Sequence, residues 1–144
     1  MSDSHPVLVA EITNTLKQVT KKPLAVLLIG GNDERKEQVA AEIVGEIGGA
    51  NYEVVCSASI PRLTPAIFYD HQTALIDLIN GTSSSYSFRS RVIQQLRASS
   101  AETIAAVWVK SSPHDNHNSA SVNKALDDAP PTAEGIEYLF EVEP

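Results

Sequence analysis

The sequence has 144 residues, of which 42% are hydrophobic and 20% are charged, as is typical of one globular domain with a sizeable core. The formal net charge of −7 argues against direct binding of nucleic acid or of an anionic membrane as the main task, because both require a basic face. No run of about 18 apolar residues predicts a membrane span, and the single Cys56 has no partner for an internal disulfide, which favours the cytosol or nucleus.

An amphipathic helix is predicted over residues 4–20. Its apolar side chains recur at helical spacing and form one stripe, namely Leu8, Ile12, Leu16 and Val19. Such a stripe has to be buried, either against the sheet of this chain or against a partner protein.

A buried strand is predicted at 24–29, where every residue is apolar. The chain then turns at Gly30 and Gly31 and enters a helix predicted over 33–47. A strand, a glycine turn and a helix form the first unit of many nucleotide-binding α/β domains.

This turn departs from the phosphate-binding pattern G-x-x-x-x-G-K-[ST] at two positions. Counted from Gly30, Arg35 replaces the second glycine, which normally lets backbone N–H groups close around phosphates. Lys36 matches the lysine, but Glu37 replaces the hydroxyl residue that normally ligates Mg²⁺. Three acids against two bases give residues 33–37 a net charge of −1. The turn has the outline of a phosphate loop without its chemistry, and an ordinary capped helix explains the same residues.

The remaining elements alternate between strand and helix. We predict strands at 52–58, 74–79, 103–109 and 135–142, and helices at 86–99 and 120–129. In the first of these strands, alternation places Val54 and Cys56 inward. Residues 59–69 are predicted to be a loop, because its prolines exclude a central strand.

Most of these strands are near-continuously apolar, which is typical of a parallel sheet covered on both faces. The sequence therefore predicts an α/β fold with a three-layer, mostly parallel sheet, helices on both faces and an extra N-terminal helix. We expect a single domain, with the amphipathic helix in residues 1–22 and the α/β core in residues 23–144.

Catalytic and metal-binding motifs are weak. His114 and His117 form an HxxH pair without a second cluster, which favours a solvated turn. Asp70 and His71 could act as a general base pair, but no nucleophile has a recognisable setting near them, so a loop ion pair is the simpler interpretation. No catalytic residue, metal or cofactor is expected.

The motifs of a GTPase are also incomplete. Asp77 ends a strand, as a Mg²⁺ carboxylate would, but Asn80 stands where the Asp-x-x-Gly pattern needs glycine. After the strand at 103–109, Lys110 matches the lysine of the Asn-Lys-x-Asp guanine motif. Val109 and Ser112 replace its Asn and Asp.

The order of elements over about residues 23–143 nevertheless resembles that of small Ras-like GTPases. Asp77, Ser87 and Phe88 hold the places where that family has a strand-ending aspartate and a Ser-Phe pair opening the next helix. Within the superfamily the chain looks most like the centromere protein M family, pseudo-GTPases of the inner kinetochore. Short matches carry this resemblance: the apolar strand that ends in glycine before an acidic loop, Asn80 with Tyr86-Ser87, and the final Glu141-Val142-Glu143.

Two features depart from that family. The helix at 4–20 precedes the first strand, and the sequence stops at the last strand, where the family has a final helix. We expect the first helix to cover the face that the final helix would otherwise cover, so deleting residues 1–20 should unfold the domain.

The resemblance implies a non-catalytic, protein-binding subunit of the constitutive centromere-associated complex that neither binds nor hydrolyses GTP. It implies a location in the nucleus at the centromere or kinetochore (otherwise the cytosol), with centromere protein I and its associated H and K subunits as partners. Candidate contact residues are those of the loop and of the basic helix face: Ile60, Leu63, Ile67, Phe68, Tyr69, Arg89, Arg91 and Arg97. The apolar loop residues could instead pack on the domain's own sheet.

Two other functions stay open. A divergent nucleotide-binding NTPase would use Lys36 on the phosphates. Another α/β adaptor or regulatory domain, such as a phosphotransfer domain, would use Asp77 at the end of its strand.

Overall fold

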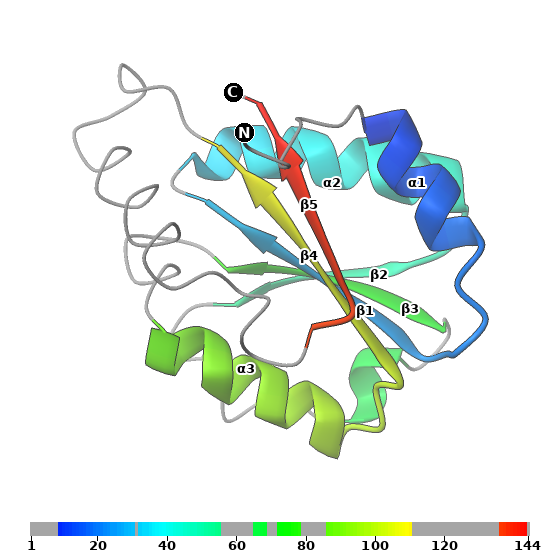
Figure 1. The fold of residues 1–144 in the computed structure, drawn as a ribbon, viewed down its shortest axis with the longest axis vertical. Coiled ribbons are helices and arrows are strands. Elements are labelled where there is room, and N and C mark those ends of the chain that lie inside the picture. The colour runs from blue at the N-terminus through cyan, green and yellow to red at the C-terminus, as the bar shows by residue number, and fades with distance from the viewer. Residues whose placement is uncertain are drawn as a thin grey trace, which may run out of the picture.

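Five strands form one sheet in which every neighbouring pair is parallel (Figure 1). They are β1 (Leu24–Ile29), β2 (Asn51–Val55), β3 (Thr73–Leu78), β4 (Thr103–Val109) and β5 (Tyr138–Val142). Their order across the sheet is β2-β3-β1-β4-β5. The chain therefore moves from β1 to one edge, returns through β3 and crosses to β4 on the other side.

Helices cover both faces of this sheet in the computed structural model. They are α1 (Val9–Lys17), α2 (Asp33–Ile47), the 3₁₀ helix η2 (Pro65–Phe68) and α3 (Tyr86–Ala98). In Figure 1, α1 and α2 lie on one side of the strands, and α3 lies on the other. The predicted α/β fold, with three layers and an extra N-terminal helix, is confirmed, and its topology is consistent with the small-GTPase-like arrangement.

The structure describes residues 9–30, 32–55, 65–68, 72–78, 86–110 and 136–143. The predicted helix at 120–129, Cys56, and the histidine-containing segments at 70–71 and 114–117 lie outside these residues. Among the helices described, none is long and apolar enough to cross a membrane.

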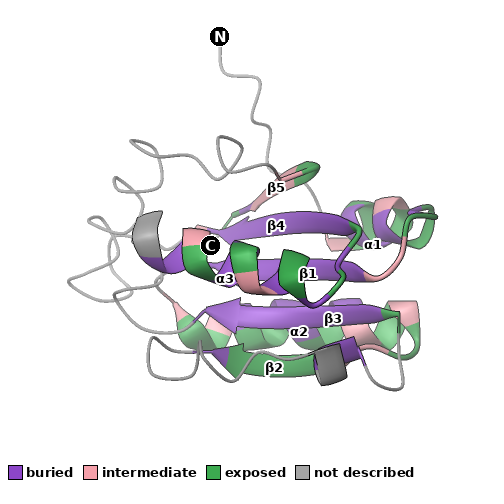
Figure 2. Ribbon diagram, turned by 90° about the horizontal axis from the view of Figure 1, so that it is seen from below, coloured by how far each residue is buried: buried purple, intermediate pink, exposed green. Residues whose placement is uncertain are grey.

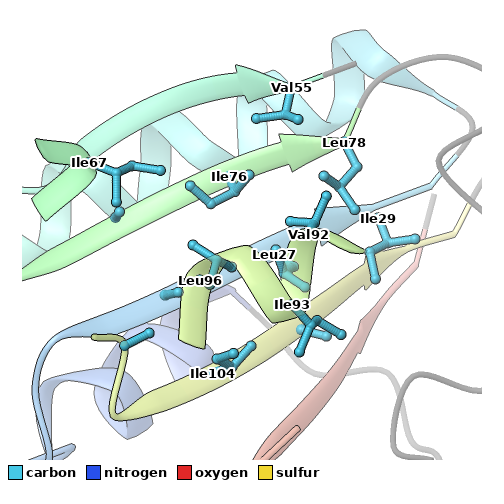
Figure 3. Close-up of a cluster of buried hydrophobic side chains, with 14 of the residues drawn as sticks. Leu27, Ile29, Val55, Ile67, Ile76, Leu78, Val92, Ile93, Leu96 and Ile104 are labelled. Carbon is cyan, nitrogen blue, oxygen red and sulfur yellow. The ribbon is translucent and has the colours of Figure 1, made fainter. Parts of the chain in front are cut away.

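The three central strands, β1, β3 and β4, are buried along their whole length (Figure 2). Burial on both faces explains why their sequences are apolar runs rather than alternating ones. On the α3 side, Val92 and Leu96 point at strand residues such as Leu27 (Figure 3). The edge strands β2 and β5 are more exposed, as Figure 2 shows.

The described part of the predicted stripe belongs to the core of this chain. Leu8 lies outside the described residues, and the helix ends at Lys17 rather than at the predicted residue 20. Ile12, Leu16 and Val19 are buried in one cluster with residues of β1, α2, β4 and β5. This decides between the two ways of burying the stripe, because the sheet and α2 already cover it. The ion pair between Lys17 and Glu46, at 3.7 Å, is solvent-exposed and contributes little.

The expectations for β2 and for the following loop need correction. The strand is described from Asn51 to Val55, one residue earlier than the predicted start, and residues 56–58 lie outside the described part of the chain; Val55 is buried while Val54 is exposed. The predicted inward position of Val54 is therefore wrong. Part of the predicted loop is ordered as η2, and the Asn51 side-chain amide donates a hydrogen bond to the Ile67 carbonyl at 2.7 Å.

Candidate functional site

The start of α2 is an ordinary capped helix terminus. Asn32 has an extended backbone, and its side-chain oxygen accepts a hydrogen bond from the Arg35 N–H at 2.9 Å. Asp33 and Glu34 lie in the first turn, where acids suit the positive end of the helix dipole. The acidic residues that weaken a phosphate loop are thus favourable for the helix itself.

Gly30, at the end of β1, has a packing reason to be glycine. A Cβ atom built there would lie 2.3 Å from the carbonyl oxygen of Val109, at the end of β4. Its φ of 154° is also one that side-chain-bearing residues rarely adopt. The close approach of β1 to β4 therefore accounts for this glycine without a bound phosphate.

We expect Gly30→Ala to lower the free energy of unfolding by about 2–4 kcal/mol, because the new methyl group meets rigid backbone. The control is Gly45→Ala in the exposed part of α2, where an added Cβ has open space around it. That change should stabilise the protein by about 0.5–1 kcal/mol. Urea unfolding of both variants measures the difference, and equal stability of the two would contradict the packing argument.

Lys36, in the first turn of α2, does not face a ligand site. Its side chain is 0% exposed. The ammonium lies 3.0 Å from an oxygen of Asp33 and 3.0 Å from Oδ1 of Asp77, and it donates a hydrogen bond to the Leu78 carbonyl. The lysine that matches the phosphate-binding pattern is therefore used inside the fold, between α2 and the end of β3.

Asp77 holds the other half of this arrangement. It is 1% exposed, and its Oδ2 accepts a hydrogen bond from the Tyr52 hydroxyl on β2 at 2.9 Å. Its Oδ1 is at ion-pair distance from Lys36 but is not aligned as a hydrogen-bond acceptor. Burial, the hydrogen bond to Asp77 and the nearby carboxylates of Asp77, Glu37 and Asp33 together raise the pKa of Tyr52 well above its ordinary value.

Asp33, Lys36, Tyr52 and Asp77 form a polar cluster, which we call the corner. It lies at the carboxyl end of β3. Ligands of open α/β sheets bind at this end of the strands. Here the Lys36 ammonium lies beside Asp77, and the carboxylates of Asp33 and Asp77 compensate its single charge. Among the described residues, no group of three or more His, Cys, Asp or Glu side chains could hold a metal ion.

Lys110, the one residue that matches the guanine motif, is also engaged within the fold. Its ammonium lies 3.0 Å from a carboxylate oxygen of Glu141 on β5 and 5.0 Å from the ring centroid of Trp108. Its backbone N–H donates to the Val142 carbonyl at 2.8 Å. These contacts join β4 to β5 and give Lys110 a structural role.

The structure corrects part of the proposed partner surface. Ile67 and Phe68 are buried in the core cluster on the α3 face, so the alternative that they pack on the domain's own sheet is correct. Ile60, Leu63 and Tyr69 lie outside the described residues.

The three arginines of α3 have different environments. Arg89 is fully buried, so its predicted outward position is wrong, whereas Arg91 is exposed as predicted. Arg97 is partly exposed, and one nitrogen of its guanidinium donates to both carboxylate oxygens of Glu137, at 2.8 and 3.1 Å. The structure therefore leaves no continuous arginine face on α3.

No protein-family profile matches this chain, and no curated protein is significantly similar in sequence.

Proposed function

We propose that this chain is a non-catalytic α/β domain that acts as a protein-binding subunit and that its first βα corner stabilises the fold rather than holding a nucleotide. The observation that carries the proposal is the environment of Lys36. A P-loop lysine works by placing an uncompensated charge on the β- and γ-phosphates. Lys36 is buried and has two carboxylates within 3.0 Å of its ammonium.

The two other candidate functions lack accessible groups. An NTPase would have to withdraw Lys36 from Asp77 and leave that carboxylate buried without its cation, at a cost of several kcal/mol. A phosphotransfer domain needs a carboxylate that a phosphate donor can reach, and Asp77 is 1% exposed. Both alternatives therefore require a rearranged corner.

The kinetochore setting enters this proposal through the sequence resemblance to the centromere protein M family. Under it, the domain would bind centromere protein I and its H and K subunits in the nucleus. Co-expression with those three proteins, followed by size-exclusion chromatography, tests this part by itself. Separate elution would reject these partners. It would not bear on whether the domain binds nucleotide, which is tested separately.

Titration with fluorescent GTP and ATP, with and without Mg²⁺, tests the central claim. We expect no saturable binding below about 1 mM, which is a binding free energy weaker than about −4 kcal/mol. Competition with unlabelled nucleotide separates real affinity from binding of the dye. Micromolar affinity that unlabelled GTP or ATP displaces would support the NTPase and reject the proposal.

A further inference from the structure

No described strand pairs with the outer edge of β2. β2 is the terminal strand of the sheet and pairs with β3 alone within the described part of the chain (Figure 2). Tyr52 and Val54 are 38% and 47% exposed and are two of the three large exposed apolar residues described. Proteins usually protect such an edge with lysine, proline or a bulge. The strand Asn-Tyr-Glu-Val-Val contains neither lysine nor proline.

An apolar hollow lies beside this edge. It has a volume of about 270 Å³ and is lined by Ala40, Ala41 and Val44 of α2, by Tyr52 of β2 and by Glu37. The register opposes Tyr52 to Leu75 and Val54 to Asp77, and Leu75 packs in the cluster under α2. Tyr52 and Val54 thus share the α2 face of the sheet, where a strand added next to β2 would direct every second side chain.

The charges around this edge are negative. Glu37 lines the hollow, Asp33 is half-exposed, and Glu53 lies exposed in the middle of the strand. Glu37 and Asp33 are close enough to Tyr52 to act on its hydroxyl electrostatically. Among the described residues, the nearest cation in sequence is Lys36, which is buried and paired with Asp33 and Asp77. An occupant with lysine or arginine side chains is therefore complementary.

A second copy of the chain is a poor occupant. In an antiparallel pairing of two β2 edges centred on the strand, Glu53 of one copy would lie opposite Glu53 of the other. Like charges directly opposite each other destabilise a strand pair. Each copy would also bring a formal charge of −7 to the contact.

We propose that the β2 edge is the partner-binding site of this domain and that it takes an extended segment of another protein, with alternating apolar and basic residues, as a sixth strand. The backbone of the segment would pair with β2, as in other strand-addition complexes. Its apolar side chains fill the hollow beside Tyr52 on the α2 face, and its basic side chains point to the opposite face, where Glu53 lies. This inference rests on the proposed protein-binding function and names where and what the domain binds.

The test uses a fluorescent seven-residue peptide of alternating valine and lysine, titrated into the whole protein and followed by anisotropy. Glu53→Lys is expected to weaken binding about tenfold, because it removes an attraction and adds a repulsion. Glu143→Lys is the matched control, since it makes the same change of charge on an exposed residue after β5. It should change the affinity by less than about twofold at moderate salt. Circular dichroism checks that both variants are folded.

A second peptide separates strand pairing from general attraction. It has the same sequence and charge, but alternate backbone amides are N-methylated, so that it cannot donate along one edge. We expect its affinity to fall by about tenfold or more. Binding of the plain peptide should also slow amide hydrogen exchange in residues 51–55.

Three results would overturn the inference: no binding of the plain peptide, equal binding of the N-methylated peptide, or equal losses in the Glu53→Lys and Glu143→Lys variants. None of them bears on whether nucleotides bind at Lys36. A failure at the β2 edge is therefore distinguishable from a failure of the proposed function.

Discussion

Replacing Lys36 with methionine is expected to lower the free energy of unfolding by about 3–5 kcal/mol, which is the usual result of removing one partner of a buried ion pair. Methionine fills much of the same volume, so the effect comes from charge. Asp77 would be left 1% exposed with only the Tyr52 hydroxyl as its partner. A phosphate-binding lysine on the surface would give the opposite result, because its removal relieves repulsion or changes nothing.

Urea unfolding, monitored by circular dichroism, measures this loss of stability. Two further variants serve as controls. Lys36→Met with Asp77→Leu is expected to recover most of the stability, because an apolar pair replaces both charges. Lys17→Met, which breaks an exposed ion pair of 3.7 Å, should change the stability by less than about 0.5 kcal/mol. A Lys36→Met protein as stable as Lys17→Met would show that the corner does not hold the fold.

Deletion of residues 1–20 is expected to leave the chain unfolded. Ile12, Leu16 and Val19 are buried in the same cluster as Val107 and Val142, so the deletion would expose the part of this face that α1 covers beside α2. Truncating a buried Ile or Leu to alanine costs about 2–5 kcal/mol. The double variant Ile12→Ala with Leu16→Ala therefore removes much of the 5–15 kcal/mol that holds a typical domain folded.

Asn14→Ala is the control for this prediction, because Asn14 is exposed on the same helix. It tests whether any change in α1 is harmful, and we expect an effect within about 0.5 kcal/mol. The measurements are solubility and near-ultraviolet circular dichroism of each protein. A soluble, cooperatively folding deletion variant would show that α1 is dispensable.

The elements β1, β4 and α2 could be predicted from the sequence, because the apolar pattern of each fits only one type of secondary structure. The runs at 24–29 and 103–109 became β1 and β4 with those bounds, and the helix at 33–47 became α2. In each case an unbroken apolar run or stripe is bounded by turn residues. Such segments gain their burial from both faces of the sheet, so their limits do not depend on distant details.

The burial of Lys36 could also be predicted from helical spacing. Lys36, Ala40 and Ile43 follow i, i+4 and i+7 along α2, which places the lysine on the buried face. Arg89 has the same relation to Ile93 and Leu96 on α3. In both cases the spacing places the residue on the buried face, although a charged side chain is ordinarily exposed. Burial of Lys36 depends on Asp77, which only the register of β3 beside β1 brings near.

The buried face of β2 could not be predicted from its own residues. Each face of β2 carries an apolar residue, Val54 on one and Val55 on the other. Which of the two is buried depends on the elements that pack against each face. Val55 packs in the cluster with Ile67 and Phe68 of η2, whereas Val54 lies on the α2 face and remains exposed. A one-residue shift in phase exchanges these sets, so local sequence alone cannot decide between them.

The ammonium beside Asp77 is bonded to the polypeptide itself, and this has a consequence for how the domain can be regulated. A metal ion or a nucleotide dissociates, so its occupancy follows its concentration in the cell, and proteins use that as a signal. The Lys36 side chain is part of the polypeptide, so its presence beside Asp77 does not follow the concentration of any ligand. Under the proposed function, control of the domain would act outside this corner, through its abundance, its chemical modification or competition among the molecules that bind it.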